Sequence, residues 1–230
     1  MIARRIPKAL LGLFFPHRCM GCGALNPDRG DVLCQECMAQ VAVWQGRGSG
    51  LFSFQTRYFD TILSPYLYCA PLKNVVLKFK YGESRRAGEF LGKLLADYAA
   101  RQLLLGHYAY ITFVPMDRLR QVSRGYNQAE VLARAVARQA GIIRPSALLR
   151  KAGRRPPQEK LGRRARLTNP LGSFEVSAPE GFSGKDVLLV DDVVTTASTV
   201  NECSRVLKEK GARRVDVLTL AASPVHGKES

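Results

Sequence analysis

The chain has 230 residues, of which 46% are hydrophobic and 23% are charged. These fractions are ordinary for a folded protein and exclude a wholly disordered chain, and the length suits one full domain with a small addition. The net charge of +16 indicates an anionic partner such as nucleic acid, a phosphorylated small molecule or an anionic lipid, with a solvated basic surface as the alternative.

Residues 1–16 combine basic side chains with a short apolar stretch, and we interpret them as an amphipathic helix. No apolar run in the chain approaches the roughly 18 residues that a membrane-spanning helix needs. A small-residue cleavage site is absent after the apolar stretch, so an export signal is the less favoured alternative. We therefore expect a cytoplasmic protein without a membrane span.

Two Cys-x-x-Cys pairs follow, separated by eleven residues: Cys19, Cys22, Cys34 and Cys37. Each pair can form a knuckle that points two thiolates at one ion, and two facing knuckles complete a tetrahedral zinc site. Gly21 and Gly23 are expected to supply the positive φ that such turns often require. Two disulfides or a redox pair are the alternatives, and a reducing compartment disfavours the disulfides. Because four thiolates leave no open position, we expect the Zn²⁺ to be structural.

A stretch rich in glycine and serine at 44–50 is typical of a linker, so we predict two domains, residues 1–45 and 51–230. The first would hold the N-terminal helix and the zinc ribbon. In the second, strands are predicted at 61–69, 110–114, 146–149, 187–190 and 215–220, and helices at 72–81, 86–105, 127–140 and 197–210. This alternation predicts an α/β fold with a mainly parallel sheet flanked by helices. Cys69 and Cys203 are expected to be buried thiols.

Ligands of such sheets bind at the carboxyl ends of the strands. Asp191 and Asp192 follow the predicted strand 187–190, and a run of small hydroxyl residues then opens a helix. Hydroxyls and free N–H groups at a helix start favour an anion, and adjacent carboxylates suit sugar hydroxyls or a metal attached to a phosphate. The pattern predicts a site for a phosphorylated sugar. A helix cap is the alternative, but it would explain one residue and not two acids with four hydroxyls.

The strand, the acid pair and the Thr-Thr turn resemble the phosphoribosyl-pyrophosphate (PRPP) signature of type I phosphoribosyltransferases. Over nearly its full length the chain also resembles the competence protein F (ComF) family. That resemblance includes the four-cysteine ribbon, Arg-Gly-Tyr-Asn-Gln-Ala at 124–129, Pro-Pro-Gln at 156–158, and then Leu161, Arg166, Asn169 and Gly-Ser-Phe at 172–174. The resemblance implies a type I phosphoribosyltransferase-like fold with a small N-terminal zinc ribbon.

The resemblance also implies roles for individual residues. Asp191 and Asp192 would be the catalytic acids and hold the ribose 2′ and 3′ hydroxyls. The PRPP loop that continues from them, with the 5′-phosphate at its hydroxyl residues, would be Val193, Val194, Thr195, Thr196, Ala197, Ser198 and Thr199. The segment after Val114 would lie near the pyrophosphate, and 150–166 resembles a hood that closes over PRPP. Candidate cations for these two segments are Arg118, Arg120, Arg124, Lys160, Arg163 and Arg166, and Mg²⁺ would bind together with PRPP.

Two positions depart from the family pattern. Ala197 stands where the superfamily usually has glycine, and its methyl group is tolerated if φ is negative. Asp117 follows a Pro-Met pair where the family more often has Pro-Val-Pro, and its carboxylate would repel pyrophosphate unless Mg²⁺ or Arg118 screens it. These departures make catalytic turnover a weaker expectation than ligand binding.

Three functions are consistent with these features. The first is an enzyme that transfers phosphoribose from PRPP to a nitrogen nucleophile. The second is a PRPP-binding protein of DNA uptake or processing that binds single-stranded DNA and contacts competence or helicase machinery. In that case Tyr126 and Phe174 would stack on bases, although packing in the core is the favoured alternative for both rings. The third is a PRPP-sensing regulator without turnover.

Overall fold

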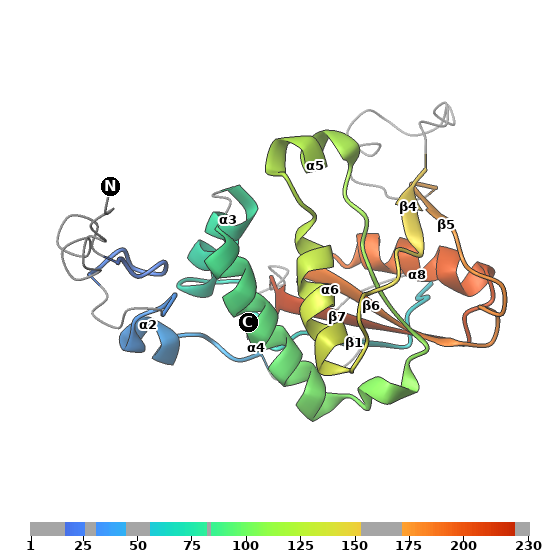
Figure 1. Ribbon diagram of the computed structural model, residues 1–230, viewed down its shortest axis with the longest axis horizontal. Coiled ribbons are helices and arrows are strands. Elements are labelled where there is room, and N and C mark those ends of the chain that lie inside the picture. The colour runs from blue at the N-terminus through green and yellow to red at the C-terminus, as the bar shows by residue number, and fades with distance from the viewer. Residues whose placement is uncertain (1–16, 26–30, 45–55, 82–83, 153–171, 224–230) are drawn as a thin grey trace, which may run out of the picture.

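The computed structural model describes residues 17–25, 31–44, 56–81, 84–152 and 172–223 (Figure 1). Its centre is a five-stranded sheet in the order β1-β7-β6-β3, with β2 pairing to the same strand β7, and all of these pairings are parallel. The strands are β1 (Thr61–Leu63), β2 (Tyr66–Leu67), β3 (Tyr110–Phe113), β6 (Asp186–Val194) and β7 (Arg214–Ala222). The predicted α/β class with a parallel sheet is therefore confirmed.

The two central strands are buried because their sequences are almost continuously apolar. Val187, Leu188, Leu189 and Val190 of β6 are all 0% exposed, as is most of β7. Strands that are covered on both faces show such runs instead of an alternating pattern. In register, Val190 pairs with Leu218 of β7 and with Phe113 of β3, so the carboxyl ends of the three strands lie together.

The longer helices are α3 (Leu72–Tyr81), α4 (Arg85–Gln102), α6 (Gln128–Gln139) and α8 (Ser198–Glu209). Helices α4, α6 and α8 pack on the sheet, and α3 packs on α4. Helices α4 and α6 pack side by side in front of the sheet in the view of Figure 1. Their close approach depends on a small residue, since a Cβ added at Gly92 would lie 3.0 Å from the Cβ of Ala135. The shorter helices are α2 (Gln35–Ala39), α5 (Arg118–Arg124) and the 3-10 turn η2 (Leu105–His107).

Several element boundaries differ from the sequence prediction. The predicted strand 61–69 is two short strands, and Pro65, which has no N–H to donate to a neighbouring strand, lies between them. Strand β6 continues to Val194, because Val193 and Val194 pair with Ala221 and Ala222, so the acid pair lies inside the strand and not after it. Helix α5 was not predicted. The strand expected at 146–149 is β4 (Leu149–Lys151), which pairs antiparallel with the unpredicted β5 (Phe174–Val176).

The N-terminal cysteine region contacts the sheet directly. Val43 forms an antiparallel bridge with Tyr66, and Leu67 N donates to Ala42 O at 3.0 Å. Cys19, Leu33 and Cys37 belong to the same buried cluster as the core of the sheet. The predicted helix at 1–16 and the predicted domain boundary at 45–51 lie outside the described residues, so the two-domain division stays a prediction. Among the helices that are described, none combines the length and the apolar character needed to cross a membrane.

Candidate active site and metal centre

The four clustered cysteines converge on one point. The sulfur atoms of Cys19, Cys22, Cys34 and Cys37 all lie within 4.8 Å of one another, and all four cysteines are free. Backbone N–H groups of Gly21 and Cys34 donate to the Cys19 sulfur at 3.3 and 3.2 Å. Burial opposes ionisation of this thiol, but the surrounding N–H donors prevail and lower the pKa of Cys19 to about 6. A set of four thiols at this separation could hold a metal ion, and Zn²⁺ suits an all-sulfur tetrahedral site.

The two glycines of the first knuckle have different roles, which corrects the sequence interpretation. Gly23 has φ +81°, as a tight turn requires, but Gly21 does not have a positive φ. At Gly21 the constraint is space, because an added Cβ would lie 2.8 Å from Leu33 Cδ2 and 2.9 Å from the Cys37 sulfur. The Asn74 side-chain amide on α3 donates to Gly21 O at 2.7 Å and so attaches the knuckle to the rest of the protein. Cys69, in contrast, is exposed and not buried as expected, whereas Cys203 is buried.

A cavity of about 610 Å³ lies beside the acid pair at the carboxyl ends of β3 and β6. Of the residues that the sequence analysis discussed individually for ligand or base binding, those that line it are Asp117, Arg120, Arg124, Phe174, Asp191, Asp192 and Thr199. Asn127, Gln128, Ala129 and Ser173 of the two family motifs also line it. It is therefore bordered by residues of β6 and the start of α8, which are close in the sequence, and by residues of α5, which is distant from both. Val193, Val194, Thr195, Thr196, Ala197 and Ser198 do not line the cavity, although they lie on the segment that joins the acid pair to Thr199.

The two acids have different environments. Burial, helped by the neighbouring Asp192 carboxylate, raises the pKa of Asp191 to about 8, and the Asp192 N–H that donates to Asp191 Oδ1 at 2.8 Å opposes this rise only in part. Asp192 instead forms an ion pair with Lys80, whose Nζ lies 2.7 Å from Asp192 Oδ2.

The sequence pattern did not identify Lys80 as a residue of the site. Its side chain is 18% exposed and lines the cavity from the last turn of α3. An ion pair between residues more than a hundred positions apart depends on the fold, which brings the last turn of α3 beside Asp192 of β6. Local periodicity carries no information about that contact.

The start of α8 has the hydroxyl-rich form that the sequence suggested. Thr196 Oγ1 and Ser198 Oγ lie 2.9 Å apart. Ala197, which precedes the helix, offers no capping side chain, and Thr196 Oγ1 accepts from Ser198 N only at the long distance of 3.5 Å. The first N–H groups of the helix therefore remain available to an anion. Ala197 precedes the helix with φ 57° and ψ 9° and is 4% exposed, so the condition of a negative φ is not met. A left-handed conformation costs an alanine about 1–2 kcal/mol relative to the right-handed region.

Replacement of Ala197 by glycine is accordingly expected to stabilise the protein. Relief of the left-handed strain in the folded protein outweighs the larger backbone entropy of glycine in the unfolded chain. The free energy of unfolding should therefore rise by about 0.5–1 kcal/mol. Thermal unfolding of the Ala197→Gly variant should show a melting temperature higher by roughly 1–4 °C. The control is Ala140→Gly, where φ is negative, and that change should lower the melting temperature. A melting temperature of the Ala197→Gly variant below that of the wild type would contradict the inference that Ala197 is strained.

The basic residues after β3 belong mostly to α5. Asp117 caps this helix by accepting from Leu119 N at 3.0 Å, so its carboxylate has a structural partner. The Arg124 guanidinium lies 4.8 Å from the ring centre of Tyr81 and donates to its hydroxyl at 3.1 Å. Arg118 begins the helix. The hood candidates Lys160, Arg163 and Arg166 lie outside the described residues.

Two further polar residues of the cavity were not singled out as ligand-binding by the sequence. Asn127 caps α6 and donates to Val114 O at 3.0 Å, which joins the helix to the loop after β3. Gln128 is 1% exposed and lines the cavity, yet neither its amide oxygen nor its amide nitrogen has a hydrogen-bond partner among the described residues. A buried amide without partners is costly, so this position favours a bound polar group in the cavity.

The two aromatic rings considered for base stacking are packed. Phe174 is 3% exposed, with Lys151 Nζ 4.3 Å from its ring centre. Tyr126 is half-buried, its ring lies 5.4 Å from that of Phe79, and its hydroxyl donates to Phe79 O. Phe174 is therefore packed in the core, as the favoured alternative to base stacking had it. Tyr126 leaves only part of its ring exposed to solvent.

Residues 126–230 match the phosphoribosyl transferase domain family. The chain is 28% identical to competence protein F of Haemophilus influenzae over 224 residues. This match covers 90% of this chain and 98% of that protein. It is 28% identical over 205 residues to the DNA utilization protein YhgH of Salmonella typhi, covering 88% of this chain and 82% of that protein. A solved structure from Thermus thermophilus has a TM-score of 0.35 at 20% identity and covers 62% of this chain and 86% of that one. The chain is thus a homologue of the competence protein F and YhgH proteins, and it carries a phosphoribosyl transferase domain.

Proposed function

We propose that the cavity beside Asp191 and Asp192 binds PRPP. The observation that carries the proposal is that the acid pair, Thr199 at the start of α8 and the cations Lys80 and Arg120 all line one cavity. The ribose diol would lie against the two acids, and the 5′-phosphate against the hydroxyls and N–H groups that open α8. The pyrophosphate would extend toward Arg120 and Arg124. The unpartnered amide of Gln128 offers a further hydrogen-bonding group in the same space.

Phosphoribosyl transfer is the reaction that this arrangement favours. The bond from the anomeric carbon to the pyrophosphate oxygen would break, and a nitrogen nucleophile would form the new bond to the same carbon. Mg²⁺ bound to PRPP would supply charge neutralisation for the leaving group. The arginines of the cavity would hold the pyrophosphate, and the acid pair would fix the ribose in position for attack. A PRPP-sensing regulator would use the same cavity without this step.

Titration calorimetry with PRPP and Mg²⁺ tests the proposal. The wild-type protein is expected to bind, and a double variant, Asp191→Asn with Asp192→Asn, is expected to lose at least about 100-fold in affinity. That loss follows because each charged hydrogen-bonding partner contributes about 1.5–3 kcal/mol. The control variant, Asp97→Asn with Glu180→Gln, removes the same charge outside the cavity and should bind like the wild type. Equal affinity of the acid-pair variant would overturn the site.

Turnover needs a separate measurement. Release of pyrophosphate from PRPP and Mg²⁺ in the presence of a panel of nucleobases and amines would identify an enzyme. Tight binding of PRPP without release across that panel would favour the regulator.

A second proposed function is the binding of single-stranded DNA within competence or helicase machinery. The net charge of +16 supports it, as do relatives that carry the names competence protein F and DNA utilization protein. Log affinity for an oligonucleotide should then fall with log salt by about 0.7 for each phosphate contact. A flat salt profile would contradict this function. A cytoplasmic location belongs to the same proposal and agrees with the free thiols of the cysteine cluster.

A further inference from the structure

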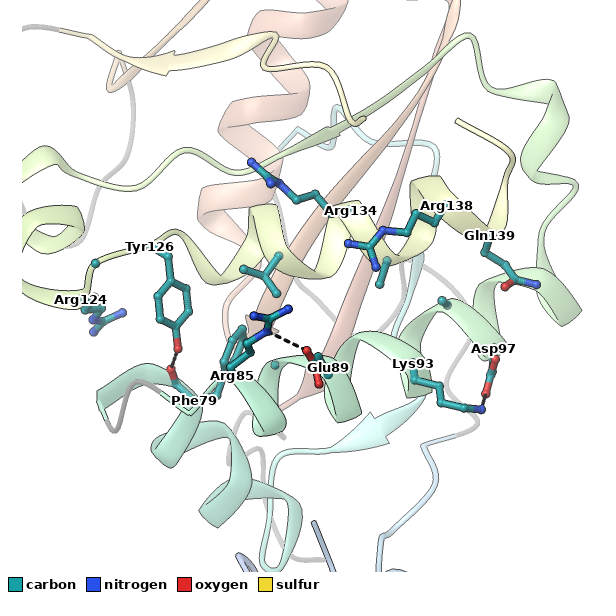
Figure 2. A pocket seen from close by; sticks show the side chains of 15 residues that line it. Phe79, Arg85, Glu89, Lys93, Asp97, Arg124, Tyr126, Arg134, Arg138 and Gln139 are labelled. Carbon is teal, nitrogen blue, oxygen red and sulfur yellow. Dashed lines mark hydrogen bonds and ion pairs between the residues drawn. The ribbon is translucent and has the colours of Figure 1, made fainter. Parts of the chain in front are cut away.

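A second and larger cavity, of about 970 Å³, lies along the line where α4 and α6 pack together (Figure 2). Its floor is formed by small or apolar residues of the two helices, among them Gly88, Val131 and Ala135. Phe79 and Tyr126 lie at one end, and the guanidinium of Arg124 lies beside them. Because Arg124 also lines the cavity of the acid pair, this α4–α6 groove begins at the mouth of the proposed PRPP site.

The two rims of the groove differ in charge. On the α4 rim the charges alternate, and ion pairs join Arg85 to Glu89 at 2.9 Å and Lys93 to Asp97 at 3.1 Å, so this side is neutral (Figure 2). On the α6 rim the groove is lined by Arg134 and Arg138 and by no acid of that helix.

The cations of the second rim are available to a partner. Arg138 is exposed and forms no ion pair with a described residue, and neither does Arg124. Arg134 is 55% exposed and pairs with Glu130 one turn away, which is an exposed pair of the kind that contributes less than about 1 kcal/mol. Together the three arginines form a cationic edge along one side of an apolar floor.

We propose that the α4–α6 groove is the binding site for single-stranded nucleic acid, with the sugar-phosphate backbone on Arg134 and Arg138 and the bases over the floor toward α4. Arg124, which the pyrophosphate of PRPP would contact, lies where the two sites meet. The inference rests on the proposed DNA-binding function and gives it a location. An extended nucleic-acid strand needs cations for its phosphates on one side and a surface for its base faces on the other. Here the α6 rim supplies the cations, and the floor and the neutral α4 rim supply the surface. The neutral α4 rim adds carboxylates that accept from exocyclic amino groups of bases.

Other occupants fit the groove less well. The basic N-terminal segment and a second copy of this chain, with its charge of +16, would both be repelled by the arginine edge. An acidic amphipathic helix would be attracted to that edge, but it would place one of its flanks against the acids of the neutral rim. It is therefore kept as a competing outcome of the test.

Fluorescence anisotropy of a labelled 15-residue oligo-dT, measured as a function of salt, tests the proposal. The two neutralising substitutions Arg134→Gln and Arg138→Gln are expected to weaken binding and to reduce the slope of log affinity against log salt by about 1.4, which is two contacts at about 0.7 each. The matched control, Arg144→Gln with Lys210→Gln, removes two exposed charges that lie outside the groove. Its slope should equal that of the wild type.

Three results would overturn the location of the site. In the first, the slope of log affinity against log salt falls equally in the groove variant and in the control. In the second, the groove variant binds as tightly as the wild type. In both cases the DNA-binding function would stand, but the groove would not be its site. Displacement of oligo-dT by a 15-residue polyglutamate at equal concentration would indicate an acidic peptide site instead. Absence of binding by the wild type would contradict the DNA-binding function itself, and circular dichroism of both variants would confirm that they are folded.

Discussion

Removal of the metal from the proposed Cys19, Cys22, Cys34 and Cys37 site is expected to unfold the N-terminal region around it. Zinc binding to small four-ligand modules contributes about 10–16 kcal/mol, and a module with few other buried side chains depends on it. Hydrogen exchange measured with and without a chelator should show that residues 17–25 and 31–44 lose their protection. The central strands β6 and β7 should keep theirs, because their cores are packed by helices that hold no metal ligand.

Two serine substitutions separate this prediction from a general effect of cysteine loss. Both Cys22 and Cys69 are exposed, but only Cys22 belongs to the cluster. Purified wild-type protein and the Cys69→Ser variant are expected to contain one zinc per chain. The Cys22→Ser variant should hold far less and should lose the same protection as the chelated protein. Equal metal content in the two variants would mean that the four thiols do not form the site.

The second large effect is expected at Glu202 of α8. This carboxylate is 3% exposed, accepts from the Arg205 guanidinium at 2.7 and 2.8 Å, and accepts from Gly172 N at 2.7 Å. Truncation to alanine leaves Arg205 and the Gly172 N–H without these partners, at a cost of about 3 kcal/mol. The melting temperature of the Glu202→Ala variant should therefore fall by roughly 6–12 °C.

Glu209 provides the matched control, because it pairs with the same arginine from a position that is 60% exposed. Glu209→Ala should change the free energy of unfolding by less than about 1 kcal/mol, as exposed pairs do. A Glu202→Gln variant keeps an oxygen for Gly172 N and should lie between the two. Equal destabilisation by Glu202→Ala and Glu209→Ala would show that burial of the carboxylate does not matter here.

The sequence could predict only those parts of the candidate site that lie within one short segment of the chain. The acid pair, the hydroxyl run and the four cysteines each combine residue type and spacing in a short segment, and such patterns carry chemical information without any knowledge of the fold. The resemblance to the ComF family then supplied the fold, and the phosphoribosyl transferase domain and the competence protein F relatives confirm it.

The remaining parts depend on long-range packing. Lys80 reaches Asp192 only because the fold brings the last turn of α3 beside β6, and the buried amide of Gln128 is noticeable only once its surroundings are known. Helix α5 was missed because it has only 7 residues, so its two apolar residues, Leu119 and Val122, make too short a pattern to indicate a helix. The length of β6 was underestimated because two acids seemed to end it, whereas its pairing with β7 continues past them.

The pairing of residues 42–44 with β2 has a consequence for the behaviour of the protein in solution. One side of β2 bonds to β7, and the other side is covered by Ala42 and Val43 of the cysteine region. A strand whose outer side is left open offers hydrogen-bonding groups to the same strand of another molecule. If loss of the metal unfolds residues 42–44, the outer side of β2 becomes an exposed strand edge that can pair with another molecule. The bound ion would therefore prevent self-association as well as stabilise the cysteine region.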